Sequence, residues 1–223
     1  MDKVFYDYEK TYEKWRKLLF TTCNFVVLYV FLIELGMFFV LKHYNLILTS
    51  DRIYLMKYLF IPTAINFIVV LIGNMVENKM PKNSGRINYI PVMELVIIST
   101  VVSCTHYIFS VTLIILCIPM LTTIIYADRK MTARIFYVCL CMLGISILYR
   151  RFAGYRYTDE FLIADAIIAS SIIIVAFYIS RVLIVFQVEK NDKIAEAYRN
   201  QMDMQKVIDK DSKTNLYNHT TFM

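Results

Sequence analysis

Five ionisable side chains interrupt the long apolar stretches of this 223-residue sequence: Glu34, Glu94, His106, Asp165 and Arg181. A charged group inside a lipid bilayer is costly, so residues of this kind mark ligand or ion sites and proton relays, or else they hydrogen-bond neighbouring helices together. Side chains at the same depth in the membrane can contact one another, so their depths decide which of these roles is possible.

Counting along the apolar stretches places Glu34, His106 and Asp165 in or near the outer third, beside a loop with three arginines. Together they form a candidate cluster for sensing a ligand, a proton or a metal. The alternative is hydrogen bonding between helices that only fixes their packing, and His106 alone fits a helix-end cap. The candidate sensing cluster comprises Glu34, His106, Arg150, Arg151, Arg156 and Asp165.

Glu94 and Arg181 fall in the inner third. Opposite charges at one depth predict either an ion pair inside the bundle or two side chains that extend separately toward the headgroups. Asn24 and Asn66 lie in the first two apolar stretches, where we expect them to hydrogen-bond neighbouring helices.

The composition predicts a membrane protein. The chain is 58% hydrophobic and 19% charged, against about 45–50% apolar residues in soluble domains. The net charge of +6 lies in short clusters beside apolar runs, where basic side chains meet anionic headgroups, so we expect no nucleic-acid partner. The five cysteines are expected to be small packing residues rather than disulfide partners or metal ligands.

The apolar stretches predict an all-α fold, a polytopic membrane helix bundle with six spans, because each stretch can cross a hydrocarbon core of about 30 Å. The 39 residues from 89 to 127 are too long for one span, so we expect two spans there, joined by a tight turn near 103–106. The remaining spans are predicted at 18–41, 53–76, 133–149 and 161–188.

The distribution of Lys and Arg predicts that both termini are cytoplasmic, in a multi-pass protein of the cytoplasmic membrane. Eleven lie in the N-terminal segment and in the loops after spans two and four, whereas six lie on the opposite side. The six are Lys42, Arg52, Lys57, Arg150, Arg151 and Arg156.

The sixth span is expected to continue as a cytoplasmic signalling helix, because helix formers follow it without proline or glycine. A heptad pattern predicts a thin, partly polar seam that could join two copies in parallel, and a solvated helix is the alternative. The seam comprises Val188, Asn191, Ala195, Tyr198 and Met202.

The run "DSKTNLYNHTTF" at 211–222 resembles the start of a GGDEF-type diguanylate cyclase domain. Such domains follow a signalling helix and open with D-x-L-T-G-L-x-N-R-x-x-F. Lys213, Asn215 and His219 depart from this pattern. The matching residues are Asp211, Thr214, Leu216, Asn218 and Phe222.

The resemblance implies a catalytic domain that condenses two GTP molecules, one per protomer of a homodimer, into cyclic di-GMP with Mg²⁺. Neither the G-G-[DE]-E-F signature nor the acidic metal-binding strand is present in these 223 residues. We therefore expect no cofactor here, with Mg²⁺ and GTP belonging to a missing domain, and a fragment or truncated gene product. The expected order is an N-terminal segment (1–17), a sensory domain (18–188), a coiled-coil linker (189–210) and a GGDEF stub (211–223).

Two other functions share this architecture. A six-span transporter or channel would not need residues beyond Val188. The sensor of a histidine kinase would need a phospho-accepting histidine followed by an acidic residue and a proline, and His219 is followed by Thr220 and Thr221 instead. The bilayer and an unidentified stimulus are the remaining expected partners.

Overall fold

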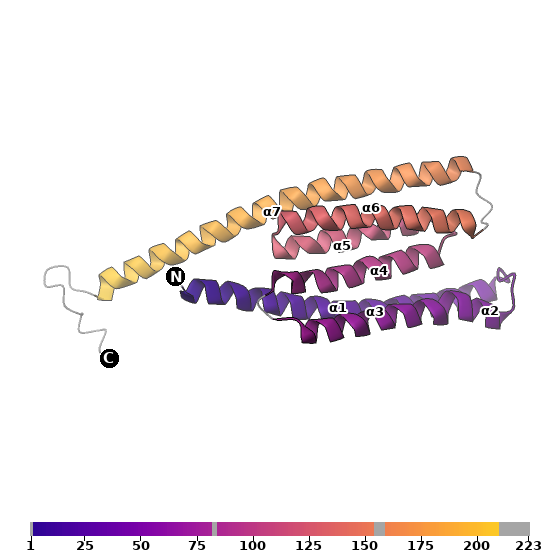
Figure 1. Cartoon of the computed structure of the whole chain (residues 1–223), viewed down its shortest axis with the longest axis horizontal. Coiled ribbons are helices and arrows are strands. Elements are labelled where there is room, and N and C mark those ends of the chain that lie inside the picture. The colour runs from indigo at the N-terminus through magenta and orange to yellow at the C-terminus, as the bar shows by residue number, and fades with distance from the viewer. Residues whose placement is uncertain (1, 82–83, 154–158, 210–223) are drawn as a thin grey trace. The chain divides into compact units, whose positions relative to one another are not determined.

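The computed structural model (Figure 1) describes residues 2–81, 84–153 and 159–209. Within these ranges the chain forms helices joined by short turns and contains no strand, which confirms the predicted all-α class. The elements are α1 Asp2–His43, α2 Asp51–Leu55, η1 Met56–Phe60, α3 Ile61–Lys79, η2 Gly85–Asn88, α4 Tyr89–Thr105, η3 Ser110–Leu116, α5 Cys117–Thr122, η4 Thr123–Tyr126, α6 Arg129–Phe152 and α7 Asp159–Asp209.

Five segments of the described chain are long and apolar enough to cross a membrane: Glu13–His43, Asp51–Lys79, Gly85–Thr105, Arg129–Phe152 and Glu160–Met204. Many large apolar side chains on α1 and α3 face outward, including Phe25, Phe67 and Ile72. An exterior of this kind is what a bilayer would cover.

The apolar segment Ser110–Tyr126 lies in the stretch where the fourth span is predicted, and it is shorter than the other five. It consists of seven residues of 3₁₀ helix, six of α-helix and four of 3₁₀ helix. Because a 3₁₀ helix rises about 2.0 Å per residue, against 1.5 Å in an α-helix, the segment reaches roughly 30 Å. The expected count of six spans depends on this stretched segment.

The turn between α4 and η3 lies slightly beyond its predicted position. Residues 103–105 belong to α4, and the chain turns at 106–109. The Thr105 hydroxyl donates to Val101 O at 2.8 Å, which satisfies this polar group inside the helix. His106 is the residue at which α4 ends, and its N–H donates to Val102 O at 3.0 Å.

The second span contains one turn of π-helix, η1, between α2 and α3. Pro62 follows at the start of α3, and proline can neither donate to a carbonyl four residues earlier nor fit against it in a regular α-helix. A wider turn before Pro62 relieves both conflicts.

The chain divides into two compact units, residues 1–181 and 182–223. In the first unit α4 lies between α1 and α3 on one side and α5 and α6 on the other (Figure 1). Nine of the 17 residues of α4 are buried. This helix is therefore the centre of the first unit.

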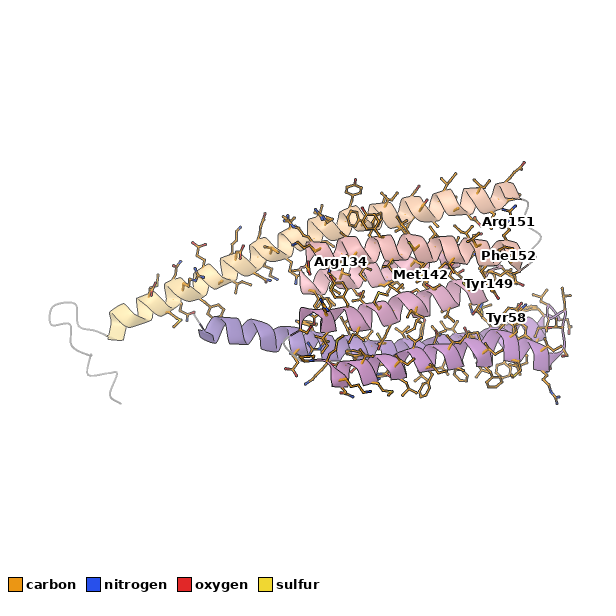
Figure 2. All side chains as sticks on the ribbon, in the orientation of Figure 1. Tyr58, Arg134, Met142, Tyr149, Arg151 and Phe152 are labelled. Carbon is orange, nitrogen blue, oxygen red and sulfur yellow. The ribbon has the colours of Figure 1, made fainter. Side chains whose placement is uncertain are left out.

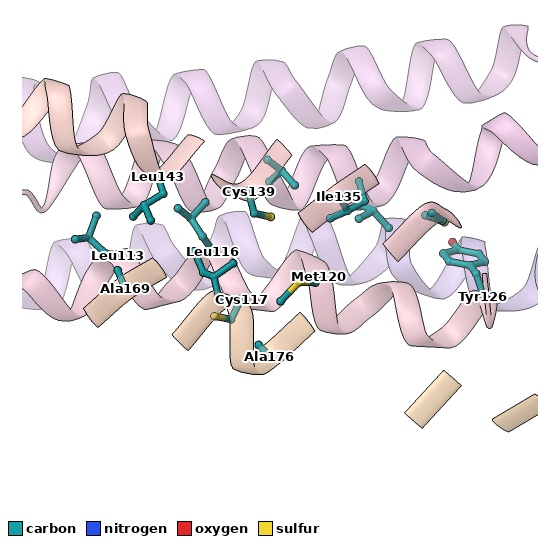
Figure 3. Packing of buried hydrophobic residues seen from close by; sticks show 14 of the residues in the cluster. Leu113, Leu116, Cys117, Met120, Tyr126, Ile135, Cys139, Leu143, Ala169 and Ala176 are labelled. Carbon is teal, nitrogen blue, oxygen red and sulfur yellow. The ribbon is translucent and has the colours of Figure 1, made fainter. Parts of the chain in front are cut away.

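Two groups of buried side chains pack against α4. The larger one, here the apolar cluster, contains Leu116, Met120, Ile135, Cys139 and Leu143 and includes residues from the first part of α7 (Figure 3). The smaller one, here the α1 cluster, consists of Cys23, Val27, Val70, Leu95, Ile98 and Val102.

The second unit is described up to Asp209 and contains the rest of α7. The predicted linker is therefore helical through Asp209. In the predicted seam, Val188, Asn191 and Ala195 are half-buried, whereas Tyr198 and Met202 are exposed. The residues of the GGDEF-like motif, 211–222, lie outside the described ranges.

Candidate functional site

The first unit has two ends, which we name after the residues found there. At the Arg16 end, α3 finishes and α4 begins. At the His106 end, α4 gives way to η3 and α6 finishes. Figure 2 shows Tyr149, Arg151 and Phe152 at the His106 end of α6, and Arg134 near the helix's other end.

At the His106 end, Glu34 of α1 meets the residue that caps α4. His106 Nε2 lies 3.4 Å from Glu34 Oε1, and the two side chains are only 14% and 2% exposed. Neither Glu34 oxygen accepts a well-aligned hydrogen bond within the described ranges. The pair is therefore a close contact between the two side chains rather than an aligned hydrogen bond.

The following turn binds two more members of the candidate sensing cluster. Arg150 of α6 is buried and donates to Phe109 O at 3.2 Å and to Thr112 Oγ1 at 2.8 Å. Ser110 Oγ donates to Asp165 Oδ2 of α7 at 2.6 Å. Residues 106–112, here the 106–112 loop, thus contact α1, α6 and α7 through polar side chains.

Tyrosines and a lysine line the same end. The hydroxyl oxygens of Tyr58 and Tyr107 are 3.4 Å apart, and this hydrogen bond, helped by burial, raises the pKa of Tyr107. Lys57 Nζ lies 5.2 Å from the ring centre of Tyr58 and 5.8 Å from that of Tyr107. Sequence reasoning counted Lys57 only among the basic residues of the outer side and did not single out the two tyrosines, although tyrosine and lysine at a span end are the signal of an interfacial belt.

The candidate sensing cluster is thus partly assembled. Glu34, His106, Arg150 and Asp165 all contact, or belong to, the 106–112 loop. Arg151 is exposed at the end of α6 (Figure 2), and Arg156 lies outside the described residues. Among residues whose positions are described, no three His, Cys, Asp or Glu side chains are grouped so that they could hold a metal ion.

The predicted ion pair between Glu94 and Arg181 is not formed. The Arg181 guanidinium lies over the Phe177 ring, 5.8 Å from its centre. Glu94 is buried against Gly73 of α3 and beside the Cys23 thiol of α1. The two side chains share a predicted depth, but Glu94 points from α4 toward α1 and α3.

The two asparagines also differ from expectation. Asn24 donates to Phe20 O of its own helix at 3.0 Å rather than to a neighbour. Asn66 is fully buried, yet neither polar atom of its side chain has a hydrogen-bond partner in the described part of the chain.

A second polar site lies at the Arg16 end. Arg16 is buried, its Nε lies 3.3 Å from Glu77 Oε1, and its Nη1 lies 3.5 Å from Asn88 Oδ1. These contacts join α1, the end of α3 and η2. Sequence reasoning had assigned Arg16 to the cytoplasmic basic segment. Its spacing from the buried residues Phe20, Cys23 and Val27 is the helical signal that could have placed it on the inward face.

This chain matches no protein-family model, no curated protein and no solved structure. Its geometry and the resemblance at 211–222 therefore carry the functional argument. The 106–112 loop contacts α1, α6 and α7, so a displacement there would act directly on all three helices.

Proposed function

We propose that this chain is the membrane sensory and transmitter module of a diguanylate cyclase and controls cyclic di-GMP synthesis from GTP. In this proposal the first unit lies in the cytoplasmic membrane with six spans, and the His106 end faces outward. Both termini are cytoplasmic. GTP and Mg²⁺ bind the catalytic domain, for which these 223 residues supply only the entrance.

The observation that carries the proposal is the hydrogen bond between Ser110 and Asp165. It links the 106–112 loop to the first turns of α7, and α7 is helical without interruption from Asp159 to Asp209. The described helix reaches Asp209, two residues before Asp211, where the GGDEF-like motif begins. A stimulus that moves the loop would therefore reach the catalytic domain through this hydrogen bond and one continuous helix.

The transmission step is a change in how two copies of α7 pair. Tyr198 and Met202 are exposed apolar side chains in the predicted seam, while Asn191 supplies a polar position. A short seam that contains a polar residue is weak, so two registers can differ by only a few kcal/mol. A small bias from the membrane part is then enough to change which register dominates.

An insertion series tests this relay. A diguanylate cyclase catalytic domain is joined in frame after Phe222, and residues are inserted between Lys193 and Ile194. Seven extra residues keep the heptad phase and should preserve cyclic di-GMP output, whereas four should rotate the seam and change output by about tenfold or more. Equal output from both insertions would contradict the proposed relay.

Two substitutions in the same fusion locate the input. Asn191→Leu should lock one register, so output becomes insensitive to Ser110→Ala, which removes the hydrogen bond to Asp165. In the unlocked protein Ser110→Ala alone should alter output. If Ser110→Ala has no effect in either background, the loop is not the input.

A six-span transporter or channel is the second candidate. It is favoured by the buried side chains of Glu34, Asn66 and Glu94, since buried polar groups in a membrane bundle mark solute or ion pathways. It predicts solute flux in liposomes that survives removal of all residues after Val188. The cyclase proposal predicts no such flux.

A further inference from the structure

Glu94 occupies a niche where three helices meet. Its side chain comes from α4, only 3% of the residue is exposed, and Gly73 of α3 lies directly opposite. A Cβ atom at position 73 would overlap Glu94 Oε1. Gly73 thus leaves the space that the carboxyl group fills.

The carboxyl group has few polar neighbours in this niche. Neither oxygen accepts a hydrogen bond from an N–H or O–H group of the residues that the structure describes. The Cys23 thiol of α1 lies beside it and donates weakly to Pro91 O at 3.5 Å. Cysteine is a weak donor, so it cannot replace the hydration that a carboxylate loses on burial.

The charged groups around the niche do not neutralise Glu94. Glu77, on α3, carries the same charge as Glu94. Arg16, on α1, is a buried cation at this end, and it already pairs with Glu77 and contacts Asn88. Tyr126 of η4 borders the Arg16–Glu77 pair. A negative charge on Glu94 would therefore be buried without a dedicated counter-ion.

We propose that Glu94 is a proton-binding site. Hydronium transfers one proton to a carboxylate oxygen, an O–H bond forms there, and a water molecule is released. A proton suits the niche better than a metal ion, which needs several oxygen, nitrogen or sulfur ligands around it. This inference is independent of the proposed cyclase function.

Binding and release of the proton change the packing of α3 against α4. The neutral carboxyl group fits against Gly73, where no side chain separates the two helices. The ionised group is drawn out of the niche toward Arg16 and water, because an uncompensated buried charge is strongly unfavourable. The proton concentration would thus control how α3 packs against α4 at this niche.

Infrared difference spectroscopy on the full chain in lipid nanodiscs tests the site. On lowering the pH, the C=O stretching band of a buried protonated carboxylic acid, separate from the band of the exposed carboxyl groups, should grow in the wild-type protein and be lost in Glu94→Gln. Glu34→Gln, which alters the other glutamate that is buried among the described residues, should retain it. Persistence of the band in Glu94→Gln, or its failure to change while the protein stays folded, would overturn the proposal.

Gly73→Ala supplies a second test that keeps the glutamate. The added methyl group should expel the carboxyl group and shift the midpoint of its titration by about tenfold or more in proton concentration. In a Glu94→Ala background the niche is empty, so Gly73→Ala should not lower the melting temperature. An unshifted midpoint in Gly73→Ala would show that the carboxyl group does not bind its proton in this niche.

Discussion

The two sides of α4 are built differently. On the side of the apolar cluster, two pairs of small polar side chains lie in contact: the hydroxyls of Thr123 and Thr132 are 2.7 Å apart, and Cys104 donates to Ser146 at 3.8 Å. On the side of α1 and α3, the buried polar groups are larger, and those of Asn66 and Glu94 lack such partners among the described residues.

This difference suggests that close packing determines the residues on the apolar-cluster side of α4 more than those on the α1 side. A buried polar group without a partner costs about 1–3 kcal/mol, so the α1 side keeps groups that an optimised core would exclude. The apolar cluster can serve as a fixed scaffold, whereas the α1 side can gain or lose protons and contacts. The contrast can be tested in free energies of unfolding, measured by denaturant titration in lipid bicelles.

The largest effect is expected at Arg16. Arg16→Gln should lower the free energy of unfolding by about 3 kcal/mol, because Glu77 would keep a partly buried charge without its partner. Lys17 is the matched control, since its exposed pair with Glu13 should contribute no more than about 0.5 kcal/mol. Equal losses in Arg16→Gln and Lys17→Gln would remove the distinction between the buried and exposed pairs.

A smaller effect is expected in the apolar cluster. Leu143→Ala should cost about 2 kcal/mol, because it leaves a cavity between α6 and its neighbours. Leu148 lies on the same helix but is exposed, so Leu148→Ala should change the free energy of unfolding by no more than about 0.5 kcal/mol. If both cost the same, the packing of the apolar cluster is not what stabilises that side.

The smallest effects should have opposite signs on the two sides of α4. Asn66→Leu should stabilise the protein by about 1 kcal/mol, because it replaces an unpartnered amide with an apolar group of similar size. Thr132→Val should destabilise it by about 0.6 kcal/mol, because it removes the hydrogen bond with Thr123. Destabilisation by Asn66→Leu would mean that the amide has a stabilising role.

Much of the His106 end could be predicted from depth alone. Counting residues along the spans placed Glu34 and His106 at one level, and the structure puts them in contact. It also placed Asp165 and Arg150 nearby, and both bind the 106–112 loop. Polar side chains at the end of a span are near the polar turns that join the helices. The depth of a residue along its span is therefore nearly enough to predict its neighbours there.

The interior could not be predicted in the same way. Depth suggested that Glu94 pairs with Arg181, but depth does not say toward which neighbouring helix a side chain points. The niche depends on Gly73, which a sequence shows only as a single glycine in an apolar run. Knowing that α3 packs against α4 at this residue requires the register between two helices, which the hydrophobic pattern leaves open.

The π turn at Met56–Phe60 changes the direction in which the side chains after it point around the axis of the second span. Tyr58, whose hydroxyl contacts Tyr107, lies in this turn, and Gly73, which faces Glu94, lies on the helix that follows. One residue turns an α-helix by about 100°. Deleting a single residue within 56–60 would restore regular winding, and the tyrosine contact and the glycine niche could then no longer be aligned at once.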